Sequence, residues 1–373
     1  MPSFIERIIL KILHFFMKFL PMQKKIIFMS SRSSMPSKDA AMLISELRRT
    51  HKDYLVGHLC VPASRSFGYF AHMCTQLLML STAQIVITDS VIFPVGMFRP
   101  RKNMFIVQIP PYTGTFKKHD LTLLDCHGGY TRHQARSVHL HRGYDLILAS
   151  GEGAAKEMSQ AYGYSENKIA IHPLPRIELL KRKSYGKKMR ERIFAAYPQL
   201  REGRNIVYCP TLRKDQKEYY RESKQMIDLL RAHSDINVIV KNHPSSKMDV
   251  LERGVITDHK FTTFEMLFAA DAVISDYSDI IFDAAVLRKP IYLYDYDLKE
   301  FSAAHPLYKI REDDLPGPLC ETPEAIEKAV MEGSFDFNKL DRFLNYNVYT
   351  GCEKETEELA SFIFDSAAKK RSI

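Results

Sequence analysis

Short apolar runs alternate with amphipathic stretches along most of the 373-residue chain. Runs rich in Ile, Val and Leu predict a first series of strands at 26–29, 54–60, 85–88, 104–108, 145–149 and 169–172. A second series predicts strands at 205–209, 238–240, 255–257, 273–274 and 291–294. Helical periodicity lies between the strands, for example at 40–49 and 154–162. This alternation is typical of α/β folds, in which helices cover parallel sheets.

The two series of strands predict two Rossmann-like domains, which a basic helical stretch at 177–204 connects. The chain is long enough for two substantial cores. We expect an amphipathic helix at 1–22, the N-terminal domain at 23–180, the C-terminal domain at 181–345 and a C-terminal helical segment at 346–373. That last helix is expected to pack back on the first domain.

Polar residues follow three of the strands predicted for the C-terminal domain. Ser275, Asp276 and Ser278 come directly before a helix expected from residue 279, and His243 and 295–297 follow two other strands. The carboxyl ends of parallel strands open onto one crevice, and free N–H groups at a helix start attract anions. The pattern therefore predicts a phosphate site, although a Ser278 that only caps the helix would produce the same pattern.

These segments resemble the CDP-glycerol glycerophosphotransferases, which prime and polymerise teichoic acids. The resemblance rests on Val-Ile-Val-Lys-Asn-His-Pro at 238–244, Ser-Asp-Tyr-Ser at 275–278 and Pro-Thr-x-Arg at 210–213, and it covers roughly residues 24–365. It implies the GT-B architecture, with two Rossmann-like domains facing a cleft. It also implies that an acceptor hydroxyl attacks the β-phosphorus of CDP-glycerol or another CDP-polyol, and that CMP leaves.

The resemblance implies roles for residues of the C-terminal, CDP-donor-binding domain. The donor would be bound by Thr211, Arg213, Lys241, Ser275, Asp276, Ser278 and Asp283. Arg213 or Lys241 would supply positive charge, and Asp283 would hold a ribose hydroxyl. His243 would donate a hydrogen bond to a phosphate oxygen or protonate the leaving group, with a purely structural histidine as the alternative.

One departure from the family affects the N-terminal, acceptor-side domain. The family shows Trp-His after Val-Gln-Leu, whereas this chain continues from Gln108 to Pro110 and Pro111, so the histidine expected to deprotonate the acceptor is absent. A second family hydroxyl is replaced by Asp279. We expect His119, later in the same loop, to serve as the base, and His127 is the alternative.

The net charge of +9 favours an anionic partner. No recognised nucleic-acid-binding module accompanies the charge, so we expect a membrane surface and no nucleic acid. Residues 4–20 are apolar but are interrupted too often by charged residues to span a bilayer. They predict an interfacial helix, with a helix packed on the protein's own surface as the alternative. The basic run at 181–192 favours a solvated helix face, with attraction to an anionic membrane surface as the alternative.

No Walker-type glycine loop or metal-type cysteine pairing is present in the sequence, so we expect no cofactor and no metal. The scattered cysteines are typical of reduced thiols in a cytosol. The sequence therefore predicts a peripheral enzyme at the cytoplasmic face of the membrane, with a lipid-linked glycan or polyol phosphate as acceptor. Two other functions stay open: a non-catalytic nucleotide-binding or scaffold homologue, and a GT-B glycosyltransferase that uses a nucleotide sugar.

Overall fold

Packing divides the chain into two units. The computed structural model describes residues 2–64, 66–213, 216–243, 246, 254–308 and 314–372, without the side chains of residues 67 and 216. Unit 1 comprises Met1–Tyr112, His119–Glu178 and Gly351–Ile373, and unit 2 comprises Thr113–Lys118 and Leu179–Thr350. These units are defined by packing, and each combines stretches that are separate in the sequence. The domain boundaries expected from the sequence therefore stay a prediction.

Unit 1 is built on a six-stranded parallel sheet with the order β2-β1-β3-β4-β5-β6. Its strands are β1 Gln23–Ser30, β2 Leu55–Cys60, β3 Ala83–Thr88, β4 Phe105–Gln108, β5 Leu146–Ala149 and β6 Ile169–Ile171. Its helices are α1 Phe4–Met17, α2 Lys38–Thr50, α3 Phe67–Thr82, α4 Phe93–Met97, α5 Arg132–Ser137, α6 Glu152–Tyr162 and α15 Glu355–Ser372. Two short 3-10 turns lie at Asp120–Leu123 and Glu166–Lys168.

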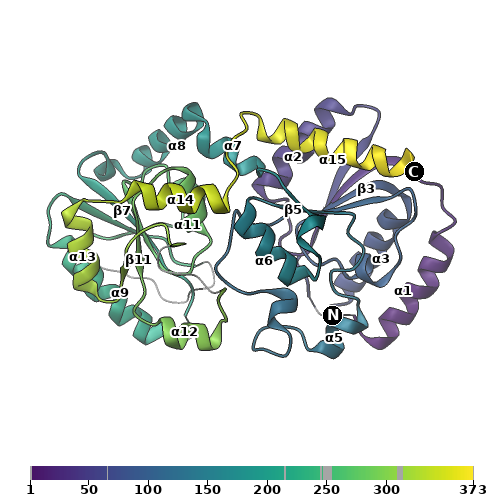
Figure 1. Ribbon diagram of the computed structural model, residues 1–373, viewed down its shortest axis with the longest axis horizontal. Helices are drawn as coiled ribbons and strands as arrows, with labels where there is room; N and C mark the ends of the chain where they lie inside the picture. The colour runs from purple at the N-terminus through teal and green to yellow at the C-terminus, as the bar shows by residue number, and fades with distance from the viewer. Residues whose placement is uncertain are drawn as a thin grey trace. The chain divides into compact units, whose positions relative to one another are not determined.

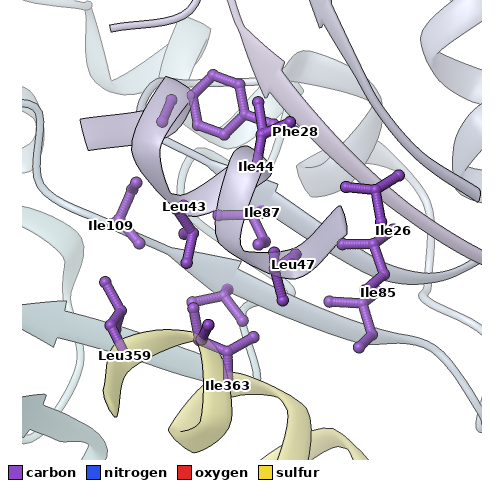
Figure 2. Packing of buried hydrophobic residues seen from close by; sticks show 14 of the residues in the cluster. Ile26, Phe28, Leu43, Ile44, Leu47, Ile85, Ile87, Ile109, Leu359 and Ile363 are labelled. Atoms are coloured by element: carbon purple, nitrogen blue, oxygen red, sulfur yellow. The ribbon is translucent and has the colours of Figure 1, made fainter. Parts of the chain in front are cut away.

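Successive side chains of β1 point to opposite faces of this sheet and contribute to the hydrophobic core on each. Ile26 and Phe28 point into the core beneath α2 and α15, and Ile27 and Met29 belong to the core of the opposite face. In Figure 2 the α2 side chains Leu43, Ile44 and Leu47 meet Leu359 and Ile363 of α15 over the sheet. The C-terminal helix thus packs on the first sheet, next to a helix near the N-terminus of the chain (Figure 1).

The N-terminal helix α1 packs along α3. Ser3 caps α1 through a capping box with Glu6, and Leu10 is fully buried beside Tyr69, Met73 and Leu77. One stripe of α1 therefore belongs to the core of unit 1. No helix among the described residues is long and apolar enough to cross a bilayer.

Unit 2 contains a second six-stranded parallel sheet, with the order β12-β11-β10-β7-β8-β9. Its strands are β7 Arg204–Cys209, β8 Ile236–Val240, β9 Ile256–Thr257, β10 Ala272–Ser275, β11 Ile291–Tyr294 and β12 Leu319–Cys320. Its helices are α8 Lys183–Ala196, α9 Gln216–Arg231, α10 Thr263–Met266, α11 Ile280–Val286, α12 Leu298–Ala304, α13 Pro323–Glu332 and α14 Phe337–Asn347, with α7 Pro175–Lys181 leading in from unit 1 and a 3-10 turn at Pro198–Arg201. The helices α9 and α13 cover one face, where Ile227 and Ile326 meet Tyr208 and Tyr292.

The six-residue segment Thr113–Lys118 lies between two stretches of unit 1 in the sequence but belongs to unit 2. Thr113 donates a 2.5 Å hydrogen bond from its hydroxyl to Asp283 of α11, and the ring of Phe116 lies 5.0 Å from that of Phe282. The peptide N–H of Lys118 donates to the carbonyl of Pro306 over 2.9 Å. Gly114 must stay a glycine here, because a Cβ would overlap the ring of Phe282.

The predicted fold class, α/β with two parallel Rossmann-like sheets, is confirmed by these two sheets. Each predicted strand overlaps an observed one, within the usual uncertainty of a few residues at the ends. The two-residue edge strand β12 was not predicted, because so short a segment carries no periodicity. The basic run at 181–192 covers the exposed face of α8, whose buried positions are Met189, Ile193 and Phe194.

Candidate functional site

The order of strands in unit 2 reverses between β7 and β10. From β7 the chain proceeds outward to β8 and β9, and then crosses back to β10, β11 and β12 on the other side. Open α/β sheets bind ligands beyond the carboxyl ends of the strands at such a reversal. The loops that begin there are residues 210–213 after β7 and 276–279 after β10.

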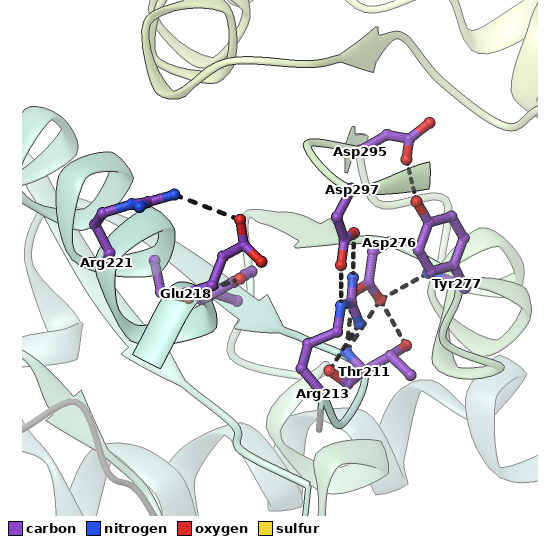
Figure 3. Close-up of polar contacts among 10 residues, drawn as sticks. Thr211, Arg213, Glu218, Arg221, Asp276, Tyr277, Asp295 and Asp297 are labelled. Atoms are coloured by element: carbon purple, nitrogen blue, oxygen red, sulfur yellow. Dashed lines mark hydrogen bonds and ion pairs between the residues drawn. The ribbon is translucent and has the colours of Figure 1, made fainter. Parts of the chain in front are cut away.

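The carboxylate of Asp276 joins these two loops. It accepts hydrogen bonds from the N–H of Thr211 (3.0 Å) and from the Thr211 hydroxyl (2.6 Å), and it pairs with Arg213 at 2.8 Å. Figure 3 shows Thr211 and Arg213 converging on this side chain. Because Asp276 is buried, these bonds compensate the loss of its hydration.

Arg213 lies buried between two carboxylates. Its Nε donates to Asp297 over 2.6 Å, Nη2 donates to the second oxygen of Asp297 over 2.9 Å, and Nη1 donates to the carbonyl of Thr211. Its guanidinium carbon lies 4.5 Å from the ring centre of Phe301. Burial opposes the charged form, but Asp276 and Asp297 outweigh it and raise the pKa of Arg213, so the side chain stays cationic.

A third carboxylate, Asp295, follows β11 and accepts a hydrogen bond from the hydroxyl of Tyr277 (Figure 3). The Tyr277 ring stacks on Phe301 with centroids 4.2 Å apart. Burial, and the neighbouring charges of Asp297 and Asp276, raise the pKa of Asp295 to about 6, although the bond from Tyr277 opposes this rise. Asp295, Asp297 and Tyr277 were not among the predicted site residues, although polar positions after the strand at 291–294 were the available signal.

A cavity of about 170 Å³ opens beside Arg213. Its lining includes Arg213, Glu218, Tyr219, Tyr296, Phe301 and His305. Aromatic rings with a few convergent polar groups are the usual lining of a small-molecule site.

Three predicted donor ligands have their polar atoms engaged within unit 2. Ser275 is fully buried and donates to the carbonyl of Cys209 over 2.6 Å. Lys241 donates to the carboxylate and carbonyl of Asp258 and to the carbonyl of Phe261, at 2.6–2.8 Å, which uses all three ammonium protons. Asp283, also buried, accepts from Thr113. In this conformation they support loops.

Ser278 and His243 are more accessible. Ser278 is half-buried in the loop before α11, and Asp279 occupies the N-cap position of that helix without a capping hydrogen bond. His243 is exposed at the end of β8, and partial desolvation together with the charge of Lys117 lowers its pKa. The proline expected to fix His243, Pro244, lies outside the described residues.

The residues that the sequence suggested for the acceptor side lie in unit 1. The carbonyl of Pro111 accepts a hydrogen bond from Arg176, which also pairs with the buried Asp39. His119 is partly buried, and its Nε2 is hydrogen bonded to the hydroxyl of Tyr112. His127 is exposed. The bond to Tyr112 makes His119 the better candidate of the two histidines considered for the base.

Comparison with known proteins places the chain in a family. The model of the CDP-Glycerol:Poly(glycerophosphate) glycerophosphotransferase family matches residues 12–354. The chain belongs to this family.

Curated relatives carry teichoic acid names. The chain is 24% identical over 306 residues to a teichoic acid ribitol-phosphate primase of Bacillus spizizenii, covering 79% of this chain and 78% of the primase. It is 23% identical over 360 residues to a teichoic acid poly(ribitol-phosphate) polymerase of the same organism, and that match covers 92% of this chain but only 57% of the polymerase. Among solved structures, the wall teichoic acid polymerase TagF superposes with a TM-score of 0.73 at 17% identity, covering 98% of this chain and 93% of that one. This last likeness concerns the fold.

We predict that Asp295 makes stability depend on pH between about 4 and 6. Its raised pKa means that the folded state holds the proton more tightly than the unfolded chain, so its stabilising contribution is present at low pH and is lost as pH rises to about 6. Asp295→Asn should therefore gain stability relative to wild type across this window, by on the order of 1 kcal/mol for each step of one in pH. Urea unfolding at several pH values measures the difference, with the exposed Asp365→Asn as control. A pH-independent difference would contradict the assignment.

Proposed function

We propose that this protein transfers a polyol phosphate, with glycerol phosphate as the first candidate, from a CDP-polyol to a lipid-linked acceptor at the cytoplasmic face of a membrane and releases CMP. The family match over residues 12–354 carries the proposal. The family description names glycerol phosphate, while the two Bacillus relatives are named for ribitol phosphate. One TagF structure was obtained after a soak with CDPG. A CDP-polyol is the class of donor that agrees with all of these names.

Phosphoryl transfer depends mainly on positioning the reactants and on neutralising the charge of the phosphoryl oxygens, and little on covalent catalysis. The acceptor oxygen forms a bond to the β-phosphorus while the bond from that phosphorus to the CMP oxygen breaks, and negative charge spreads over the remaining phosphoryl oxygens. Fixed donors and a cation in a partly dry pocket stabilise that charge. The loops after β7 and β10 offer Arg213 and Ser278 for this purpose, and the end of β8, the strand next to β7, offers His243.

Arg213 can bind a phosphate in place of one of its two carboxylate partners. Its guanidinium has five N–H donors and now uses them on Asp276, Asp297 and the Thr211 carbonyl. A donor phosphate at the 170 Å³ cavity would replace Asp297 while Asp276 keeps the loops together. We assign supporting roles to Thr211, Asp276, Lys241, Ser275 and Asp283, which hold the site through their contacts within unit 2.

His243 fits hydrogen-bond donation better than proton donation. Its lowered pKa keeps the imidazole neutral at pH 7, and a neutral imidazole still donates one N–H to a phosphoryl oxygen. On the acceptor side, we assign His119 as the general base that deprotonates the acceptor hydroxyl, since Pro111 cannot accept a proton.

The direct test is incubation with CDP-glycerol or CDP-ribitol and a lipid-linked acceptor, with CMP release as the readout. Release that requires the acceptor supports the proposal. Binding of CDP without transfer of any CDP-polyol would instead identify a non-catalytic homologue, and product masses from a nucleotide-sugar screen would reveal a glycosyltransferase.

His243→Ala should lower turnover by roughly 10²-fold, because one donor to the developing charge is removed. His243→Gln should recover part of this loss, since its amide can donate a hydrogen bond at any pH. The control is His58→Ala, which removes an exposed histidine from β2 of unit 1. Turnover equal to wild type in His243→Ala would exclude the role.

The exposed face of α1 and the turn after it support the membrane part of the proposal. Leu10 of this helix is buried, but six large apolar side chains around it are 54–71% exposed, namely Phe4, Ile5, Ile12, Phe15, Phe16 and Phe19. Lys18 lies 4.3 Å from the ring centre of Phe15. Aromatic and aliphatic side chains beside lysines suit the headgroup region of an anionic bilayer.

Replacing Phe15, Phe16 and Phe19 by Ser should abolish sedimentation with liposomes that contain anionic lipid, and raising salt should weaken the wild-type association. These positions leave the buried Leu10 contact intact, whereas deletion of α1 would remove it from the core of unit 1. Leu55→Ser, at an equally exposed residue of β2, is the control. A triple variant that still sediments would mean that the membrane contact lies elsewhere.

A further inference from the structure

A chain of proton-carrying side chains runs through unit 1 around His119. The Tyr112 hydroxyl is bonded to Nε2 of His119, and Nδ1 of the same ring lies 3.8 Å from Oδ2 of Asp120. Nε2 of a second histidine, His141, lies 3.4 Å from the same oxygen. His141 is buried and stacks on Tyr162 with centroids 4.2 Å apart. The order of groups is phenol, imidazole, carboxylate, imidazole.

The backbone around this chain is strained. Among the described residues, positive φ at a non-glycine residue occurs at Asp120 (51°), Asp125 (61°), His139 (48°), His141 (59°) and Arg288 (53°). Four of these five therefore lie between residues 120 and 141, and two of them, Asp120 and His141, are members of the chain. Strain of this kind costs on the order of 1 kcal/mol or more per residue and is concentrated where a side chain must be aimed.

The surroundings favour an ionised Asp120. Burial acts to raise its pKa, but the contact with His141 and the charges of His141, His119 and Arg32 outweigh burial and lower it. Tyr130 and Tyr144 also face the group, and burial raises the pKa of both phenols. A negative Asp120 next to neutral phenols is suited to stabilise an imidazolium at His119.

Covalent connectivity links Tyr112 to the donor-side helix of unit 2. The next residue, Thr113, donates its hydroxyl to Asp283 of α11, the helix that follows the loop of Ser278. A trans peptide separates neighbouring Cα atoms by about 3.8 Å. Tyr112 thus directly precedes in sequence a segment that packs on α11, and its hydroxyl is bonded to His119.

We propose that Tyr112 is the residue that takes the proton of the acceptor hydroxyl, that His119 is the base behind it, and that Asp120 and His141 are positioning residues. The inference rests on the proposed transfer function and deepens its acceptor side. As the acceptor oxygen forms its bond to the β-phosphorus, it gives its proton to the Tyr112 oxygen, and the original Tyr112 proton moves to Nε2 of His119. The P–O bond to CMP breaks at the same time, and its electron pair leaves with CMP. His119 later returns the proton to Tyr112, and Tyr112 releases its own to solvent or CMP.

The test compares CMP release and CDP binding in the full-length protein. Tyr112→Phe should lower turnover by about 10²-fold, His119→Gln by a similar factor, and the double variant by little more than either, because groups that act as one unit are not additive. CDP affinity, measured by calorimetry, should stay within about twofold, since the donor contacts are in unit 2. Tyr54→Phe, which removes a phenol bonded to Gln84 in unit 1, is the matched control.

Asp120→Asn separates positioning from a merely structural role. Asn tolerates the positive φ of Asp120, so the fold should be kept. Loss of the carboxylate destabilises the imidazolium, so turnover should fall about tenfold and the rising limb of the pH–rate profile should move to lower pH.

The outcomes distinguish the two proposals. A wild-type protein that releases no CMP from any CDP-polyol overturns the proposed function and this inference together. A wild type that releases CMP, with Tyr112→Phe at wild-type turnover or Asp120→Asn with an unshifted pH profile, overturns this inference alone. Should Tyr112→Phe fail to fold, His119→Gln and the pH profile of Asp120→Asn decide in its place.

Discussion

The buried carboxylate of Asp276 is the interaction on which the unit 2 site depends. It holds the loop after β7 to the loop after β10 by bonding Thr211 twice and Arg213 once. A buried charge is stable only when it is paired and hydrogen bonded, and removal of one partner of such a pair typically costs several kcal/mol. The reversal of strand order brings the loops together, and Asp276 then fixes their side chains. The same network keeps Arg213 cationic at the mouth of a cavity.

The segment Thr113–Lys118 interrupts unit 1 and packs as part of unit 2. Thr113 bonds Asp283, Phe116 packs near Phe282 and Phe343, and Gly114 allows the close approach of the Phe282 ring. A hydroxyl–carboxylate bond and an aromatic cluster together give this six-residue segment a defined register. The residues that flank it, Tyr112 and His119, are themselves bonded to each other, so the loop is closed at its base.

The fold followed from the sequence because periodicity reports burial directly. The unbroken apolar runs at 26–29 and 291–294 could be assigned to buried strands without tertiary information. The sequence also indicated that polar residues gather where the strands of the second sheet end, because parallel strands deliver their carboxyl ends to one edge; that this edge binds a ligand stays a prediction.

The roles of individual site residues were harder to predict, because they depend on partners far away in sequence. Lys241 is occupied by Asp258 and Phe261, and Ser275 by Cys209, so neither the cation nor the hydroxyl faces a ligand. Tyr112 was not considered from the sequence, because its bond to His119 closes a loop that strand and helix periodicity does not describe.

The central claim is that Arg213, held by Asp276, binds the β-phosphate of a cytidine nucleotide. The most direct measurement is calorimetric titration of CDP and CMP into wild type and Arg213→Gln, with the exposed Arg288→Gln as control. We expect wild type and the control to bind CDP about tenfold more tightly than CMP, equivalent to about 1.4 kcal/mol, and Arg213→Gln to bind both nucleotides alike. A folded Arg213→Gln protein that keeps the full preference for CDP would contradict the account.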